Sequence, residues 1–103
     1  MYKYQFSTKF ILDVSLVLEY IASILSNPAA SKRLRNEINT NIQSIKVFPE
    51  GFPIFDTEGK TQYIYRKVRV KNYYILYYID SNNSIVVFSR FVYSKMNLNE
   101  LEL

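Results

Sequence analysis

The spacing of apolar residues changes once along the chain, and this change constrains the fold more than any other feature. In the first half, apolar residues recur every three or four positions, which is typical of one buried face of a helix. From Tyr63 onward the spacing shortens to two, as in half-buried β-strands. We therefore expect an α+β fold, with helices packed on one face of a sheet.

Two helices are predicted in the first half of the chain. Ser7 can cap the first helix, whose apolar stripe covers Phe10–Ile24. This helix ends at Asn27-Pro28, because the residue before a proline disfavours the helical region. The same dipeptide supplies an N-cap and a first-turn proline to the second helix, which ends at Phe48-Pro49. The short connection predicts an antiparallel helical hairpin.

One strand is predicted before the helices and three after them. We expect these strands at Tyr2–Phe6, Tyr63–Val70, Tyr73–Ile79 and Ser84–Tyr93. Lys71-Asn72 is a two-residue turn in which the asparagine tolerates positive φ, and residues 80–83 form the second turn. Such short turns make the last three strands an antiparallel meander. Residues 49–62 are expected to be a loop and residues 97–103 a tail with one helical turn, so that residues 1–103 form a single domain.

Composition excludes several kinds of chemistry. The chain has no cysteine and no histidine, which excludes disulfides, thiolate zinc sites and cysteine nucleophiles. Any acid–base chemistry must therefore come from Tyr, Lys, Arg, Asp or Glu. The sequence has no metal-ligand spacing and no phosphate-binding glycine loop, so we expect no metal and no cofactor. Apolar runs are far shorter than the ~20 residues that span a bilayer. We expect a soluble, cytoplasmic protein without a membrane partner.

Positive charge is concentrated in the second half of the chain. Residues 60–95 contain seven basic residues and one acid, Asp80, for a net charge of +6, whereas the whole chain has +4. Such a region suits a polyanion or an acidic partner. A merely solvated Lys/Arg face is an equally good interpretation at this point.

Alternation assigns the residues of two predicted strands to opposite faces. In the first meander strand one face carries Tyr63, Tyr65, Lys67 and Arg69, and the other carries Ile64, Arg66, Val68 and Val70. In the last strand one face carries Val86, Phe88, Arg90 and Val92, and the other carries Ile85, Val87, Ser89, Phe91 and Tyr93. A face that mixes tyrosines with cations suits nucleic acid, because rings stack on bases and cations bind phosphates. Alternatively, the tyrosines reflect only their high strand propensity.

Arg66 and Arg90 each lie among apolar neighbours in their strands. An unpaired charge in a core is unfavourable, so each arginine needs partners or a concave site. Two interpretations stand: structural bridges to Asp13 or Glu19, or a functional role at a binding site.

Five segments follow one another in a familiar order. They are YQFSTKFILDVSLVLEYI, NPAASKRLRNEI, IKVFPEGFP, YRKVRVKNYYILYYID and VVFSRFVYSKMNLNEL. In this order the chain resembles the RelE/ParE superfamily of toxins from type II toxin–antitoxin modules, of the plasmid-stabilisation type. The resemblance implies a growth-inhibiting toxin held inactive by a cognate antitoxin. RelE-like members cleave mRNA in the ribosomal A site, and ParE-like members poison DNA gyrase.

Only some of the site residues of the superfamily are matched in this sequence. The resemblance implies substrate binding by residues of the meander, here Tyr65, Arg66, Lys67 and Arg69. The superfamily ending R-x-x-[HY]-x-[RK] is matched by Arg90, Tyr93 and Lys95, which makes these three the candidate catalytic groups. Two RelE-like features are missing: the tail tyrosine would fall near Leu101, and Tyr74 replaces the arginine of the middle strand.

Three functions are therefore expected, in the following order. The first is a ribosome-dependent mRNA endonuclease, in which Tyr93 transfers a proton or stacks on a base while cations stabilise the phosphate. In-line attack by a ribose hydroxyl mainly needs positioning and charge stabilisation, so the missing histidine does not exclude it. The second is a gyrase inhibitor without bond chemistry, favoured by the long helical hairpin and the NPAA start. The third is an inactive, partner-binding homologue. The expected partners are the antitoxin and either the ribosome with its mRNA or DNA gyrase.

Overall fold

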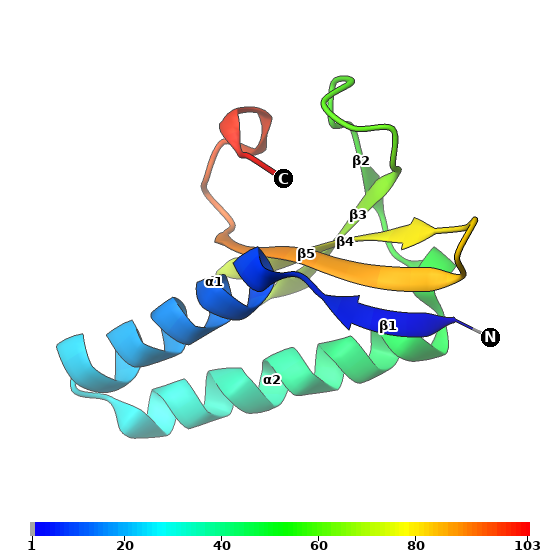
Figure 1. Ribbon diagram of the computed structural model, residues 1–103. Coiled ribbons are helices and arrows are strands. Elements are labelled where there is room, and N and C mark those ends of the chain that lie inside the picture. The colour runs from blue at the N-terminus through cyan, green and yellow to red at the C-terminus, as the bar shows by residue number, and fades with distance from the viewer. Residues whose placement is uncertain (1) are drawn as a thin grey trace.

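A five-stranded sheet with a helical hairpin on one face makes up the structure, which is a computed structural model describing residues 2–103 (Figure 1). Residue 1, the first of the expected domain, lies outside the described residues. The strands are β1 (Lys3–Phe6), β2 (Ile54–Phe55), β3 (Tyr65–Val70), β4 (Tyr73–Asp80) and β5 (Ile85–Tyr93). The helices are α1 (Thr8–Glu19) and α2 (Pro28–Val47), with short helical turns at Tyr20–Ile24, Pro49–Gly51 and Leu98–Glu100. The α+β fold class expected from the sequence is confirmed.

The strands lie in the order β1-β5-β4-β3-β2, which makes the sheet mixed. β3, β4 and β5 form the predicted antiparallel meander, and β1 pairs with β5 in parallel, from Lys3 opposite Ile85 to Phe6 opposite Phe88. The sheet also gains β2, which pairs with β3 in the segment expected to be a loop. A two-residue strand between proline and glycine residues carries too little alternation to be found from the sequence.

Both predicted helix caps are confirmed. The Ser7 side chain accepts a hydrogen bond from the Phe10 amide at 2.9 Å, and the Asn27 side chain accepts one from the Ala30 amide at 3.1 Å. The first helix does not stay α-helical to its end, because Tyr20–Ile24 is a π-helical turn. The hydroxyl of Ser31 donates to the Leu18 carbonyl and ties the two helices together.

The main core lies between the helices and the sheet. It contains residues from both helices and from three strands, namely Phe10, Leu34, Ile38, Ile42, Ile45, Val68, Val70, Ile75, Tyr77, Val86, Phe88 and Phe91. The four α2 residues recur every three or four positions, as the helical spacing predicts. The buried Tyr77 hydroxyl donates to the Pro49 carbonyl at 2.6 Å, so this polar group is satisfied within the core.

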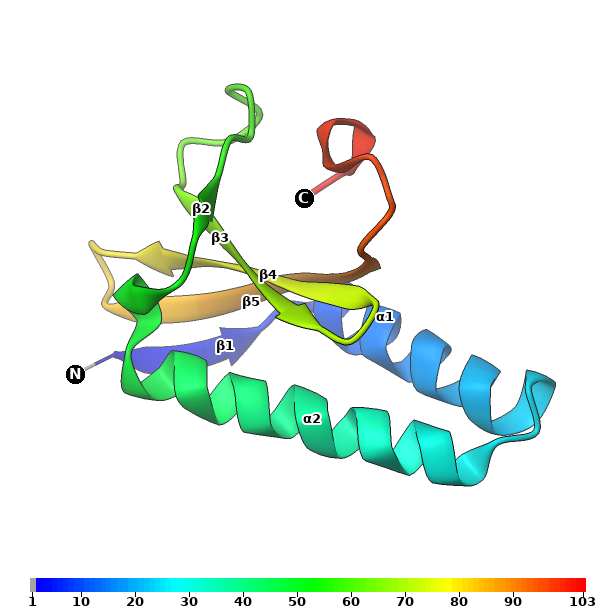
Figure 2. The ribbon, with the colours of Figure 1, turned by 180° about the vertical axis from the view of Figure 1, so that it is seen from behind.

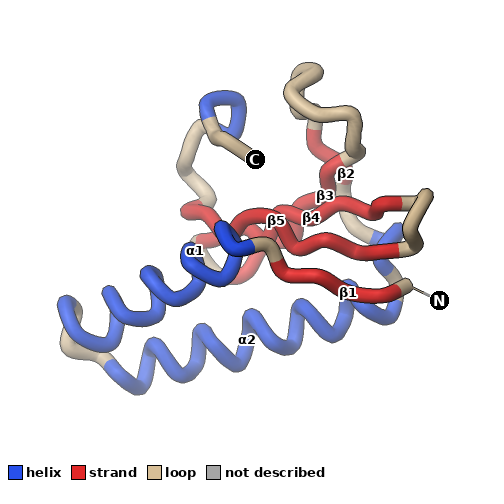
Figure 3. Tube along the Cα trace, in the orientation of Figure 1, coloured by secondary structure: helices blue, strands red, loops and turns tan. Residues whose placement is uncertain are grey.

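The opposite face of the sheet is covered in its middle. The segment that contains β2 and the C-terminal tail both rise from this face, away from the helices (Figures 2 and 3). A second apolar cluster lies between them, formed by Tyr65, Leu76, Val92 and Leu101 with partly buried neighbours that include Phe55, Tyr63, Tyr74, Tyr78, Leu98 and Leu103. The face of the sheet opposite the helices is therefore partly closed by the chain itself.

A β-bulge at Ser89 makes one predicted face assignment wrong. Leu76 of β4 pairs with Arg90, whereas the next residue, Tyr77, pairs with Phe88, so Ser89 has no partner on β4. Strict alternation breaks at this point. Arg90 consequently faces away from the helices, opposite Phe88, and Phe91 joins Phe88 in the main core. The faces predicted for β3 are confirmed, because Val68 and Val70 lie in the core while Tyr65 lies in the second cluster.

The first hairpin turn is also as predicted, except for its strained residue. Val70 pairs with Tyr73, which leaves Lys71-Asn72 as a two-residue loop. The positive φ of 54° falls on Lys71 and not on the asparagine.

Among residues 2–103, no helix combines the length and the apolar character needed to cross a membrane.

Candidate functional site

The predicted site residues are divided between the two faces of the sheet. Cross-strand neighbours point to the same face, so the pairing of the meander strands assigns each residue to one side. Tyr65, Lys67, Arg69 and Arg90 pair with Tyr78, Leu76, Tyr74 and Leu76 and lie on the face opposite the helices. Arg66 and Tyr93 pair with Tyr77 and Tyr73 and lie on the helix-packed face.

Lys67, Arg69 and Tyr74 form a small cationic group on the face opposite the helices. The Lys67 ammonium lies 5.0 Å from the centroid of the Tyr74 ring, and the Arg69 guanidinium lies 5.6 Å from it. Arg69 also donates from Nε to the Lys71 carbonyl. Both cations stay at least partly exposed, and the ring face holds them over one surface. This group, which we call the Tyr74 cation cluster, is available to an acidic partner.

Tyr65 is a core residue of the second cluster. It is buried, and its hydroxyl shares a 2.9 Å hydrogen bond with the Ser89 hydroxyl. Burial raises the pKa of the Tyr65 phenol, while the hydrogen bond from Ser89 lowers it in part. The ring therefore positions the β3–β5 contact and has little surface on which a base could stack.

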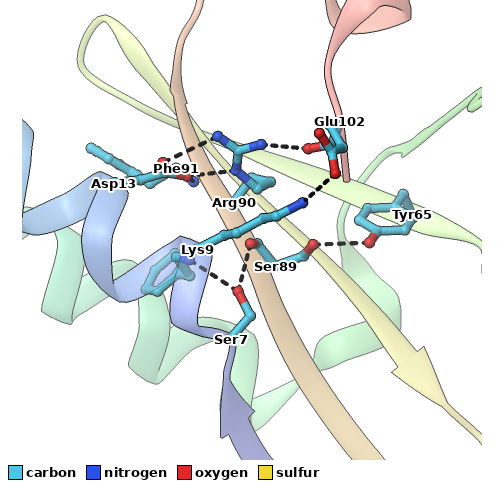
Figure 4. Close-up of polar contacts among 9 residues, drawn as sticks. Ser7, Lys9, Asp13, Tyr65, Ser89, Arg90, Phe91 and Glu102 are labelled. Carbon is cyan, nitrogen blue, oxygen red and sulfur yellow. Dashed lines mark hydrogen bonds and ion pairs between the residues drawn. The ribbon is translucent and has the colours of Figure 1, made fainter.

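Arg90 is held by the chain itself, as Figure 4 shows. Its Nε and Nη2 atoms donate to the two carboxylate oxygens of Asp13 at 2.8 and 3.1 Å. A third guanidinium nitrogen donates to the backbone carbonyl of Glu102 in the tail. Asp13 also accepts from the Phe91 amide at 3.0 Å, at the edge of β5 that β1 no longer covers. The structural interpretation, a bridge to Asp13, describes what the arginine does in this structure.

Arg66 is likewise bound to backbone. Its Nη1 donates to the carbonyls of Glu50 at 3.0 Å and Phe52 at 2.7 Å, and it thereby fastens the turn after α2 to β3. The side chain lines a cavity of about 410 Å³ between this turn and the β4–β5 hairpin, together with Tyr2, Glu50 and Asp80. The two carboxylates beside it make the cavity unsuitable for a phosphate.

Tyr93 and Lys95 lie at the end of β5. The Tyr93 ring is exposed, and it meets the Tyr73 ring edge-on at a centroid distance of 6.0 Å. Tyr73 in turn stacks on Phe91 at 5.0 Å. Lys95 is exposed in the turn that follows, where the Met96 amide donates back to the Tyr93 carbonyl. The Tyr93 ring thus contacts Tyr73 and otherwise remains exposed to solvent.

Burial raises the pKa of several tyrosines. Desolvation raises the pKa of Tyr77 to about 12 and also raises the pKa of Tyr73 and Tyr78. Phenols with raised pKa values keep their protons at neutral pH and cannot act as general bases there.

Within residues 2–103, no group of three or more Asp and Glu side chains is placed to hold a metal ion.

Comparison with known families decides the class to which this chain belongs. A family model described as the ParE toxin of type II toxin–antitoxin system, parDE, matches residues 4–98. The chain belongs to the ParE toxin family. The superfamily expected from the sequence is confirmed, and the match narrows it to the ParE branch.

Solved structures show the same fold for this ParE family member. The chromosomal ParDE TA system from P. aeruginosa contains a chain that matches with a TM-score of 0.70 at 10% identity, covering 92% of this chain and 98% of that one. The archaeal RelE-RelB complex from Pyrococcus horikoshii OT3 matches with a TM-score of 0.52 at 14% identity, covering 93% and 98%. At such identities the likeness concerns the fold. A search of the curated proteins finds no significant match.

Two residues that sequence reasoning missed help to hold this region together, Ser89 through the Tyr65 hydroxyl and Glu102 through Arg90. Asp13, in contrast, was one of the two carboxylates expected to bridge to an arginine of the sheet, and it binds Arg90. Glu102 could not have been found, because no pattern in the sequence predicts where the tail folds.

Proposed function

We propose that this ParE family toxin inhibits DNA gyrase by binding it and makes or breaks no covalent bond itself. The observation that carries the proposal is the family match over residues 4–98, because ParE-like members of the superfamily are gyrase poisons. The toxin function itself implies a cognate antitoxin that holds the chain inactive in the cell.

The division of the candidate groups supports a binding activity over RNA cleavage. A nuclease needs its proton-transfer group and its phosphate-binding cations around one reacting atom. Here Tyr93 lies on one face of the sheet and the Tyr74 cation cluster on the other. Arg90 and Arg66 are already engaged with a carboxylate and with backbone carbonyls. The mRNA endonuclease expected first from the sequence therefore has less support than the gyrase alternative.

The site residues take different roles in this proposal. Lys67 and Arg69 on one face of the sheet, and Tyr93 and Lys95 at the end of β5, are available to partners, because each is at least partly exposed. Arg66, Arg90 and Tyr65 are positioning residues, since they bind strands β3 and β5 to neighbouring segments of the chain.

The proposal is tested by inducing the chain in bacterial cells without its antitoxin. Growth should stop, DNA synthesis should fall before protein synthesis, and messenger RNA should stay intact. The variant Lys67→Ala/Arg69→Ala should weaken the arrest, because rim cations speed association and add affinity. Lys3→Ala/Lys60→Ala removes the same charge from exposed positions elsewhere and should arrest growth like the wild type. Early, codon-bounded cleavage of messages would overturn the proposal in favour of the nuclease.

A further inference from the structure

We infer that the Tyr74 cation cluster binds the phosphate backbone of the DNA that gyrase holds, so that this toxin recognises the gyrase–DNA complex and not gyrase alone. The inference rests on the proposed function and deepens it, because it names the polyanion that this part of the sheet contacts. It depends on the charge, the spacing and the surroundings of Lys67 and Arg69.

Lys67 and Arg69 are cations without an acidic partner. Lys67 is partly exposed, Arg69 is exposed, and neither forms an ion pair among residues 2–103. Asp80, the one acid in residues 60–95, lies at the far end of β4 from Tyr74. Six residues of an extended strand separate the two, which corresponds to roughly 20 Å. The cluster is therefore a region of uncompensated positive charge, which favours an anionic ligand.

The spacing of the two cations suits a phosphate backbone. Residues two apart on a strand project to the same face about 6.8 Å apart, because each residue of an antiparallel strand advances by about 3.4 Å. Phosphates of one DNA strand follow one another every ~3.4 Å along the helix axis. Lys67 and Arg69 can therefore contact different phosphates of the same DNA strand.

The Tyr74 ring holds both side chains before any ligand binds. The Lys67 ammonium lies 5.0 Å and the Arg69 guanidinium 5.6 Å from the ring centroid, and Arg69 Nε donates to the Lys71 carbonyl. Long cationic side chains lose rotamer freedom when they bind a ligand, and restraint in advance reduces that loss. The terminal nitrogens of Arg69 remain for a phosphate, which a guanidinium binds through two parallel hydrogen bonds.

The strands beside the cations offer little apolar surface to a protein. Leu76 and Val92, the cross-strand neighbours of Lys67 and Tyr74, are 0% and 4% exposed because they pack with Leu101 in the second cluster. The centre of a protein–protein interface is apolar, whereas an interface with DNA is more polar and more positively charged. This difference favours DNA over an acidic segment of gyrase.

Arg69 lies where the sheet has an open edge. β2 pairs with β3 at Tyr65 and Arg66, so among residues 2–103 the final part of β3 has no further strand on that side. The guanidinium is therefore accessible from the edge of the sheet as well as from its face.

Surface plasmon resonance with the chain immobilised measures its affinity for gyrase alone and for gyrase loaded with linear duplex DNA. Lys67→Gln/Arg69→Gln should weaken binding of the loaded enzyme only. Each lost phosphate contact lowers the slope of log affinity against log salt by about 0.9. Raising KCl from about 50 to about 200 mM should therefore weaken the wild-type complex with loaded gyrase roughly twelvefold more than the variant complex.

The matched control is Lys32→Gln/Arg33→Gln, which removes the same charge from exposed positions of α2 on the other side of the sheet. This variant should bind both forms of gyrase like the wild type. An unchanged melting temperature in circular dichroism shows that each variant folds.

Two results would overturn the inference. Equal weakening with and without DNA, in a folded Lys67→Gln/Arg69→Gln variant, would assign the cluster to an acidic surface of gyrase itself. Unchanged binding and unchanged salt dependence with loaded gyrase would remove the cluster from target recognition. Failure of the proposed function is distinguishable, because the wild-type chain would then bind neither form of gyrase.

Discussion

Asp13 joins three parts of the chain: α1, β5 and, through Arg90, the tail. It accepts two hydrogen bonds from the Arg90 guanidinium and one from the Phe91 amide. The two side chains are only 16–17% exposed, so the pair is little screened by solvent. The three hydrogen bonds explain why a residue on a helix, far from β5 in sequence, controls the edge of the sheet.

Removing this carboxylate should destabilise the protein. We expect Asp13→Ala to lower the free energy of unfolding by about 2–4 kcal/mol, because it leaves a partly buried guanidinium and an amide unpaired. Urea denaturation measures this change. Glu102→Gln breaks the exposed Lys9–Glu102 pair, whose side chains are 46% and 89% exposed, and should cost less than about 1 kcal/mol. Equal effects of the two variants would contradict the structural role of Asp13.

Tyr77 should make stability depend on pH in the alkaline range. Burial raises the pKa of its phenol from 10.0 to about 12. Between these values the unfolded chain loses the proton that the folded chain keeps, so the free energy of unfolding falls as pH rises from 10 to about 12. Urea midpoints measured across this range should fall less steeply for Tyr77→Phe than for the wild type. Parallel pH profiles of the two proteins would refute this cause.

At the scale of elements, sequence periodicity was sufficient for the helices and for the meander. Ser7 and Asn27 cap the helices as predicted, and the main strands lie within a few residues of their expected bounds. These features depend on local chemistry, which the sequence contains. The parallel pairing of β1 with β5 and the short strand β2 depend on contacts between distant segments, which no local pattern specifies.

The bulge at Ser89 had the largest effect on the predicted site. One extra residue in β5 exchanges the faces of the residues that follow it. Arg90 therefore does not share the face of Phe88, as strict alternation predicts, and Tyr93 does. Arg90 and Tyr93 remain on different sides, and Lys67 and Arg69 share a side with Arg90. The cations and phenols of the second half could be listed from the sequence, whereas the face of the sheet on which each one lies could not.

The C-terminal tail is the element whose packing is most easily tested. Leu101 is buried in the second cluster against Tyr65, Leu76 and Val92. Leu101→Ala should lower the free energy of unfolding by about 1–3 kcal/mol, at or below the low end for buried leucines because a chain end can relax around the gap. Hydrogen exchange of the tail amides should become faster. Met96→Ala, at an exposed position in the turn just before the tail, is the control and should change neither quantity.

At the scale of the whole molecule, one sheet separates two surfaces with different chemistry. One side carries the helical hairpin, with exposed apolar residues of α1 and exposed cations of α2. The other carries the Tyr74 cation cluster beside a second apolar cluster. Two separate surfaces suit a protein that must bind an antitoxin and a target, and they do not gather the groups that a nuclease needs. We therefore propose that the toxin acts by binding.

Supercoiling of relaxed plasmid by purified DNA gyrase, with the chain titrated in, tests this claim most directly. We predict that supercoiling stops as the chain reaches excess over gyrase, that added antitoxin restores it, and that mRNA in a translating extract stays intact at the same dose. Unchanged supercoiling at a large excess of the chain, together with cleaved message in the extract, would contradict the account.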